Sequence, residues 1–115
     1  MFKILLPFSI LIAFATACDS DSSSEEPNDV DCSLLTYQNF GEPFLADYCL
    51  GCHSSSAANR NGAPGAVNFD TLEEVRTRSI RMNARAGIGM TMPPVNGPSP
   101  QEREDLSQWI GCGNP

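Results

Sequence analysis

The residues of this chain with the clearest chemistry are two thiols and an imidazole in the segment Cys49-Leu50-Gly51-Cys52-His53. Two thiols three residues apart can each form a thioether with one of the two vinyl groups on the same edge of a porphyrin. The adjacent imidazole can then reach under the ring, so that its Nε2 atom ligates the iron. Cys-x-x-Cys-His is accordingly the attachment signature of c-type haem. The motif predicts one haem c, bound covalently through Cys49 and Cys52, with His53 on the iron.

A Cys-x-x-Cys pair has two other common uses, in a thiol redox motif and as half of a zinc site. A zinc site lacks ligands here, because His53 is the only histidine and the only other cysteines after residue 31, Cys32 and Cys112, tend to be oxidised in an exported chain. A thioredoxin-like redox site is disfavoured as well, because no βαβ pattern surrounds the motif. The haem interpretation is therefore preferred.

The N-terminus has the features of an export signal. Lys3 precedes an almost wholly apolar stretch over residues 4–15, and a helix of that length spans about 18 Å, too short for a hydrocarbon core of about 30 Å. The stretch ends in Ala15-Thr16-Ala17-Cys18, which resembles the bacterial lipoprotein box. We expect residues 1–17 to be a signal peptide and Cys18 to carry lipid at the periplasmic face of a bacterial membrane. Ordinary secretion into the periplasm is the alternative. Export also favours the haem interpretation, because covalent haem attachment takes place outside the bacterial cytoplasm.

The segment that follows the signal is strongly acidic. Residues 18–31 contain six carboxylates and one valine, a composition that cannot bury a core, so we expect a disordered tether. The whole chain has 14 Asp and Glu against 7 Lys and Arg, a net charge of −7. Nucleic acid is excluded as a partner, because its binding needs a basic face. Residues 32–115 remain for one domain, and a domain so short usually needs a disulfide, a metal or a cofactor for stability.

Three helices and no strands are predicted for this domain, which makes it all-α. The first helix should begin between residues 36 and 43 and run into the cysteine motif, with Phe40, Phe44 and Tyr48 along one buried face. The second should open at residue 70 or 71, where Thr71 and Glu74 form a capping-box pattern.

The third helix has the clearest start signal. Ser99 is its expected N-cap, with Pro100 at the first helical position and Glu102 completing a capping box, and Gly111 should end it. Its inner face consists of Leu106, Trp109 and Ile110. Long loops over residues 54–68 and 87–98 separate the helices. Loops of that length in so small a domain suggest that they wrap around a bound group.

Residues 36–113 resemble the class I c-type cytochromes in their small bacterial monohaem form. The resemblance rests on the aromatic helix that leads into the cysteine motif, on Thr91-Met92-Pro93-Pro94, and on the last helix over residues 102–110. It implies a small cytochrome c fold, in which about three helices and long loops wrap around one haem. It also implies that the first and last helices cross and that a methionine from a late loop is the sixth ligand of the iron.

Met92 is the predicted sixth ligand. It precedes two prolines that stiffen the backbone, and the family carries its ligand at a Met-Pro pair. Met90 is the alternative, because residues i and i+2 of an extended segment point the same way. Met82 lies on the second helix and is expected in the core. A thioether paired with histidine raises the reduction potential of the iron.

The resemblance also implies roles for residues around the haem. The histidine Nδ1–H should donate to a backbone carbonyl at a proline about a dozen residues downstream, and Pro64 fits by spacing. The haem propionates need donors, for which Arg60 and Arg85 are the candidates, and a solvated surface position is the alternative for both. Cys32 and Cys112 flank the two helices that the family fold brings together, so we expect a disulfide between them.

These features predict an electron carrier and not an enzyme, passing single electrons between redox protein partners. Because Lys3 is the only lysine, the basic docking ring of many c-type cytochromes cannot form in the processed chain. Three alternatives remain open. One is a haem-based gas sensor in which Met92 detaches from the iron, and another is the electron-entry subunit of a larger redox complex. The third is a structural lipoprotein without haem, in which Cys49 and Cys52 form a short disulfide. A haem peroxidase is disfavoured, because no second histidine is available.

Overall fold

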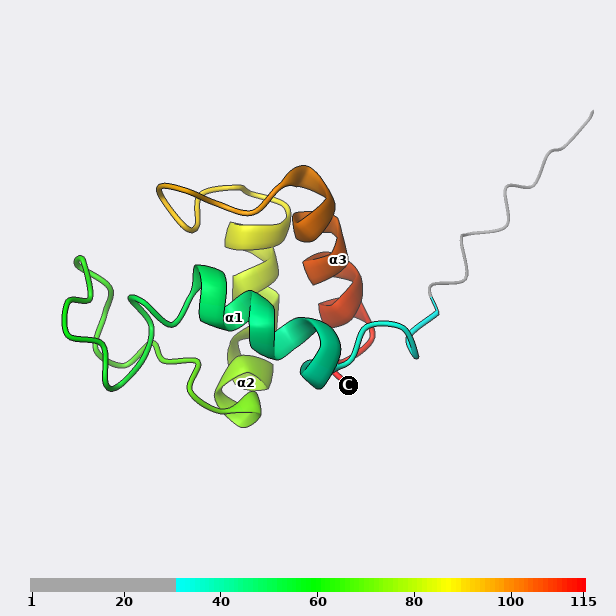
Figure 1. Cartoon of the computed structure of the whole chain (residues 1–115), viewed down its shortest axis with the longest axis horizontal. Coiled ribbons are helices and arrows are strands. Elements are labelled where there is room, and N and C mark those ends of the chain that lie inside the picture. The colour runs from blue at the N-terminus through cyan, green and yellow to red at the C-terminus, as the bar shows by residue number, and fades with distance from the viewer. Residues whose placement is uncertain (1–30) are drawn as a thin grey trace, which may run out of the picture.

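The computed structural model of the chain describes residues 31–115 (Figure 1). The predicted signal peptide at residues 1–17, the lipidation site Cys18 and the predicted tether up to residue 30 lie outside the described residues. Between residues 31 and 115 the chain contains three α-helices, two π-helical segments and no strand. The all-α prediction is confirmed for this part of the chain. None of these helices has the length and hydropathy of a membrane span.

The first helical region consists of a π-helical segment, η1 (Tyr37–Gly41), continued by helix α1 (Glu42–Tyr48). It begins at Thr36, whose Oγ1 accepts from the Asn39 N–H at 3.2 Å while Asn39 Oδ1 accepts from the Thr36 N–H at 2.7 Å. This reciprocal cap satisfies two backbone donors that would otherwise lack partners. The start lies inside the predicted range, although the sequence analysis did not identify this cap.

The aromatic face predicted for this region is present. The ring of Phe44 lies 5.3 Å from that of Phe40 and 5.1 Å from that of Tyr48, measured between centroids. Phe44 is buried, and the other two rings are partly buried against the same core. Such tilted ring contacts suit the aromatic quadrupole and fix the helix against its neighbours.

The other two helices also begin at their predicted caps. Helix α2 (Leu72–Met82) starts at the Thr71 capping box, and helix α3 (Pro100–Gly111) starts at the Ser99 capping box. One extension was not predicted: α2 continues into a second π-helical segment, η2 (Asn83–Gly87), so this helical region ends five residues later than α2 itself.

Trp109 of α3 is the centre of the core and is fully buried. Its ring stacks on Tyr37 at 6.4 Å and meets Phe40 edge-on at 5.9 Å, both on the first helical region. Leu45, Val75 and Leu106 are buried around it to 1 % exposure or less. The first and third helical regions therefore pack against each other, as expected, while α2 contributes Val75 to the same core.

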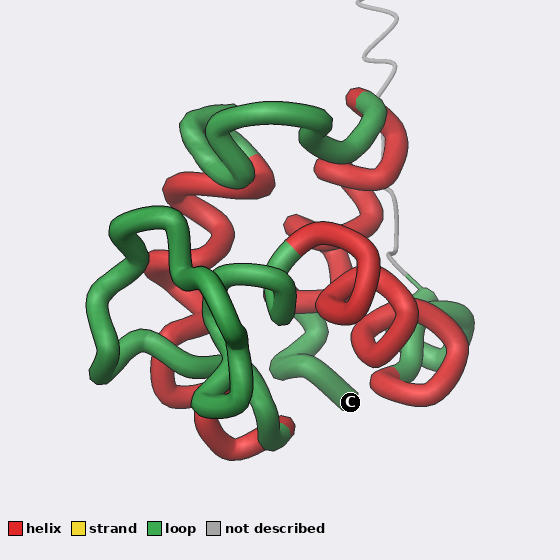
Figure 2. Tube along the Cα trace, turned by 60° about the vertical axis from the view of Figure 1, so that its left-hand side comes forward, coloured by secondary structure: helices red, strands yellow, loops and turns green. Residues whose placement is uncertain are grey.

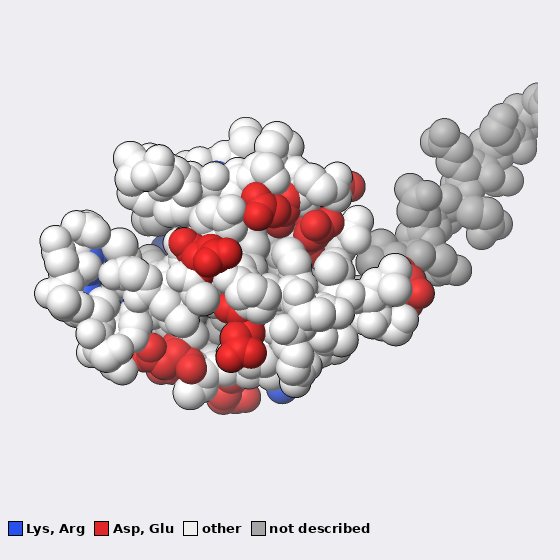
Figure 3. Space-filling view, viewed as in Figure 1, with Lys and Arg blue, Asp and Glu red and all other residues white. Residues whose placement is uncertain are grey.

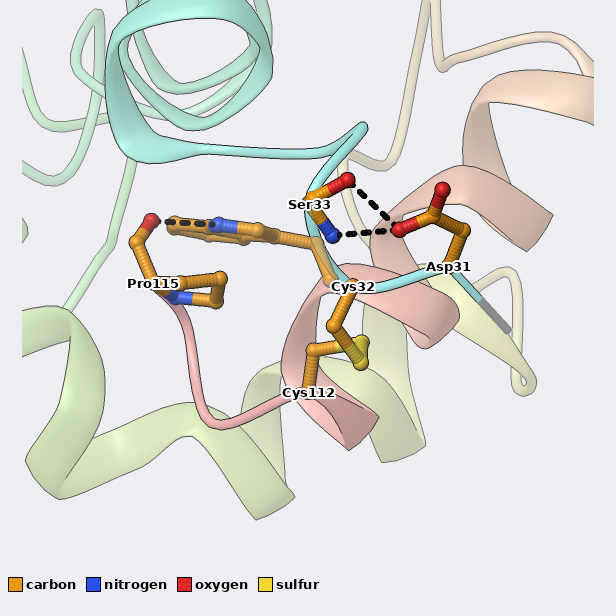
Figure 4. Close-up of a disulfide and its surroundings, with 6 residues drawn as sticks. Asp31, Cys32, Ser33, Cys112 and Pro115 are labelled. Carbon is orange, nitrogen blue, oxygen red and sulfur yellow. Dashed lines mark hydrogen bonds between the residues drawn. A yellow bond between two sulfur atoms is a disulfide. The ribbon is translucent and has the colours of Figure 1, made fainter. Parts of the chain in front are cut away.

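A disulfide between Cys32 and Cys112 joins the two ends of the domain, with 5.5 Å between the Cα atoms, so this prediction is confirmed. Figure 4 shows the bond and, on the same side of the domain, Pro115. The backbone oxygen of Pro115 accepts from the Tyr37 N–H at 2.6 Å and from the Trp109 indole N–H at 3.3 Å. Covalent and hydrogen bonds thus fasten the start of η1 to the end of α3.

The two long loops project from the same side of the helices. One connects α1 to α2 and the other connects η2 to α3, and both extend to the left in Figure 1, while Figure 2 draws them in green. Most of the apolar core lies on the helical side. The two loops, α2 and the end of α1 line a cavity.

Candidate functional site

A cavity of about 260 Å³ lies between the two long loops and α2, and its walls are predominantly apolar. Cys49, Cys52 and His53 line it from the end of α1, and Met92 lines it from the second loop. These four residues were predicted from sequence to act together. They are up to 43 positions apart in the sequence (92 − 49), and the fold brings them to one cavity.

The two thiols differ in their surroundings. Cys49 is 8 % exposed, and its burial raises the pKa of the thiol to about 12, so that it stays protonated near neutral pH. Cys52 is partly exposed, and Asn61 Nδ2 donates to its Sγ at 3.3 Å. Both are free thiols, so the short disulfide of the structural-lipoprotein alternative is not present. Within residues 31–115, no group of three or more His, Cys, Asp or Glu side chains could hold a metal ion.

The imidazole of His53 is held in one orientation. Its Nδ1 atom lies 3.0 Å from the carbonyl oxygen of Val67. A carbonyl can only accept, so Nδ1 carries a proton, and in the neutral imidazole the lone pair is on Nε2. The ring also packs against Phe69 at 5.2 Å between centroids, and the Phe69 N–H donates to the His53 carbonyl at 2.8 Å. These contacts fix the orientation of the ring at the wall of the cavity.

The predicted acceptor for this imidazole, Pro64, is wrong. The Pro64 carbonyl lies in a turn of its own, where it accepts from the Val67 N–H at 2.9 Å and from Arg60 Nη2 at 2.8 Å. This turn directs the carbonyl three residues later, that of Val67, toward His53. Pro64 still lines the cavity.

The role predicted for Arg60, donation to haem propionates, does not match its contacts. The side chain lines the cavity, but its guanidinium binds the backbone of the loop. It donates to four carbonyl oxygens, those of Ser54, Ala63, Pro64 and Val67. The carbonyls of this loop have no helical N–H groups as partners, and the loop contains no other long side chain. The guanidinium of Arg60 therefore supplies their hydrogen-bond donors.

Arg85 lines the cavity, as its predicted role requires, and it is exposed. Arg78 and Arg81, which were not predicted as site residues, line the cavity from the same helical region. Arg78 Nη2 donates to the Ala66 carbonyl at 2.7 Å, while the side chains of Arg81 and Arg85 make no hydrogen bond within residues 31–115. Arginines spaced along a helix are typical of a solvated face, and only the loop that folds over α2 turns this face into a wall.

The charge of the cavity wall is unbalanced. No carboxylate belongs to the wall among the described residues, whereas four arginines do. Arg81 and Arg85 stand at i and i+4 on one helical face, where two like charges destabilise a helix by roughly 0.2–0.5 kcal/mol. An anionic group in the cavity would relieve this repulsion and accept their hydrogen bonds.

The structure separates the two methionines considered for the sixth position. Met92 lines the cavity and is 37 % exposed, whereas Met90 is 66 % exposed and is not part of the wall. The Met92 N–H donates to the Arg85 carbonyl at 3.0 Å, and Arg103 Nη1 donates to the Met92 carbonyl at 2.9 Å. Arg103, which the sequence analysis did not single out, thus fastens this loop to α3. Met82 is buried in the core, as predicted.

Tyr48 connects the cavity to the outer face of the helices. Its ring lines the cavity, and its hydroxyl donates to Glu102 Oε1 on α3 at 2.9 Å. This hydrogen bond is the main cause that raises the pKa of the Tyr48 phenol.

Figure 3 shows that carboxylates are the main charged groups on the face of the molecule that carries α1 and α3, with only a few arginine atoms visible at its edges. Four arginines of the domain therefore gather at the cavity wall, whereas carboxylates dominate the face shown in Figure 3.

Comparison of the chain with protein-family models, with curated proteins and with solved structures found no match. The function of the chain is therefore inferred from its own residues and their geometry.

Proposed function

We propose that this chain is a small monohaem c-type cytochrome that carries single electrons between redox partners. One haem would be attached through Cys49 and Cys52, and His53 and Met92 would hold its iron. The observation that carries this proposal is that the Cys-x-x-Cys-His motif and Met92 line the same predominantly apolar cavity.

The chemistry of the cavity suits this group. Its apolar walls match a porphyrin ring, and its arginines match the two carboxylates that the ring carries. The two cysteines are free thiols, as thioether formation requires. Each S–H would add across one vinyl group: the S–H bond and the vinyl π bond would break, a C–S bond would form, and the hydrogen would go to the neighbouring carbon. The Nε2 lone pair of His53 is available, because Nδ1 is engaged with the Val67 carbonyl.

Bound haem supplies reversible exchange of one electron between ferric and ferrous iron. The residues of this chain fix the ligands, exclude water through Phe44, Val67 and Phe69, and set the potential through the arginines of the wall. Neither His53 nor Met92 would then be left to act on a substrate, which supports an electron carrier and not an enzyme.

The proposal includes the fold and the place of action. The helices and the two long loops would form a small cytochrome c fold around the haem. The N-terminal sequence supports export, with a signal peptide at residues 1–17 and lipid on Cys18 at the periplasmic face of the membrane. A docking partner would be another redox protein, and it could belong to a larger complex in which this chain is the electron-entry subunit.

A haem-based gas-binding module is the second candidate. It is favoured by one observation, the 37 % exposure of Met92 on a loop and not on a helix. A ligand so placed could leave the iron and admit a small gas. Rapid binding of carbon monoxide to the reduced protein would support this candidate, and slow or absent binding would support the electron carrier.

Covalent attachment tests the proposal. The full chain is expressed together with haem c maturation machinery, and the intact mass is measured after denaturation. We expect the mass of the processed chain plus one haem. Haem should be lost on denaturation from the Cys49→Ser/Cys52→Ser double variant and retained by the matched Cys32→Ser/Cys112→Ser variant. A wild-type protein that carries no haem would contradict the proposal.

A further inference from the structure

The carbonyl oxygen of Val67 accepts two hydrogen bonds that meet at one atom. His53 Nδ1 lies 3.0 Å from this oxygen, and Arg60 Nη2 lies 2.9 Å from it. The oxygen that orients the imidazole is therefore also bound to a cation. The motif does not predict this arrangement, because Arg60 and Val67 are seven and fourteen residues beyond His53 (60 − 53 and 67 − 53).

Arg60 holds this oxygen as part of a wider set of contacts. Its Nη2 atom also donates to the Pro64 carbonyl at 2.8 Å, and its Nε and Nη1 atoms donate to Ala63 and Ser54. The planar fork of a guanidinium offers five N–H donors, whereas an ammonium is a single point with three. Arg60 thus fixes the turn that presents the Val67 carbonyl to His53.

We propose that Arg60 is a positioning residue for His53, which acts on the iron ligand through the carbonyl that the two residues share. The inference rests on the proposed function, since it concerns the same ligand. This role, at the Nδ1 atom of His53, replaces the role first expected of Arg60, which was donation to the haem propionates.

The shared oxygen has a definite electronic consequence. A charged donor withdraws electron density from the carbonyl, so the hydrogen bond that the same oxygen accepts from His53 is weaker. An imidazole whose Nδ1–H is bound less strongly is a poorer electron donor to the metal. Ferric iron needs that donation more than ferrous iron, so Arg60 should raise the reduction potential.

A simple charge effect must be distinguished from this mechanism, because any cation near the iron raises the potential. Arg60→Lys keeps the charge but cannot span the same carbonyls. Arg78→Gln removes a charge from the same cavity wall and breaks a bond to the same loop, at the Ala66 carbonyl one residue before Val67, without touching the shared oxygen. It is the matched control.

The experiment uses the haem-loaded protein and two readouts, the reduction potential and the proton resonance of the His53 Nδ1–H in the ferrous state. We expect Arg60→Lys and Arg60→Gln both to shift this resonance and to lower the ferrous-to-ferric ratio severalfold at a fixed applied potential. Arg78→Gln should leave the resonance in place. An Arg60→Lys protein with the potential and resonance of the wild type would reduce the role of Arg60 to its charge and overturn the inference.

A measurement on the wild type keeps the test decisive if the variants do not accumulate. Slowly exchanging guanidinium protons of Arg60 should give nuclear Overhauser effects to the His53 Nδ1–H in the loaded protein, and their absence would contradict the shared carbonyl. A wild type without haem would overturn the proposed function together with this inference. A normally loaded wild type with unshifted Arg60 variants would overturn the inference alone.

Discussion

Gly41 of η1 lies directly against the indole of Trp109 on α3, and no side chain would fit between them. A Cβ atom at this position would overlap the six-membered ring of the indole. Both residues are buried, so neither can move toward solvent to make room. The close approach of the first and third helical regions therefore depends on the absence of a side chain at residue 41.

Substitution of this glycine should destabilise the fold. We expect Gly41→Ala to lower the free energy of unfolding by about 1–3 kcal/mol, the usual cost of overpacking a filled core. Gly111→Ala is the matched control, because it lies on α3 and a Cβ there would have no neighbour within 4 Å. Urea unfolding of both variants measures the difference. Equal stability of the two would contradict the packing described for Gly41 and Trp109.

The helices of this domain were predictable because their signals are local. The capping boxes at Thr71 and Ser99 each need only a hydroxyl and a carboxylate three residues later, and both helices begin there. The burial of Trp109 and Leu106 likewise follows from their spacing on one helix. The cap at Thr36 was missed because its partner is Asn39, which lacks the carboxylate of the usual pattern. The η2 segment has no comparable signal.

The disulfide should carry a large share of the stability of this small domain. The Cys32–Cys112 bond closes a loop with a sequence separation of 80 residues, and such a loop is worth about 4 kcal/mol in the chain-entropy estimate. The Cys32→Ser/Cys112→Ser variant should therefore unfold at a clearly lower urea concentration than the wild type. Treatment of the wild type with a thiol reductant should give the same loss, since thioethers resist it. An unchanged midpoint in both cases would contradict this role.

Stability should fall in acid, in part through Glu102. Its carboxylate accepts from the Ser99 N–H at 2.7 Å and from the Tyr48 hydroxyl at 2.9 Å, and these bonds, that of the Ser99 backbone first, hold its pKa below the usual 4.5. A carboxyl whose pKa is lower in the folded state stabilises the fold above its unfolded pKa. That contribution is lost as the pH falls through the folded pKa.

The free energy of unfolding, measured between about pH 6 and about pH 2, checks this expectation, because carboxylates titrate in roughly this range. Glu102→Gln should flatten the acid limb of the curve. Glu104→Gln is the control, because that residue is exposed on the same helix and makes no hydrogen bond within residues 31–115. The Glu102 contribution is refuted if the two variants have the same pH dependence.

The arginine pair on the cavity wall should hold the carboxylates of the haem. Arg81→Gln/Arg85→Gln removes both positive charges, so negative charge near the iron is less compensated and the reduction potential should fall. Arg76→Gln removes one charge from the same helix outside the cavity, and it should leave the potential close to that of the wild type. Redox titration of the loaded proteins measures both. A double variant with an unchanged potential would contradict this assignment.

The wall of the cavity could be predicted only in part, for a physical reason. Cys49, Cys52 and His53 are adjacent and form a motif, and Met92 precedes two prolines, so each is visible in the sequence. The position of the Val67 carbonyl depends on a turn stabilised by Arg60, and the inward position of Arg81 depends on how that loop covers α2. Such relationships arise from tertiary packing, which no local pattern encodes.

The visible spectrum of the haem-loaded protein, with the Met92→Ala and Met90→Ala variants beside it, reports which residues ligate the iron. His53 and Met92 ligation predicts a sharp low-spin ferrous spectrum and the weak far-red ferric band of a thioether ligand. The band should be lost in Met92→Ala and kept in Met90→Ala, since only Met92 lines the cavity. A high-spin spectrum of the wild type, or a far-red band that survives Met92→Ala, would contradict ligation of the iron by His53 and Met92.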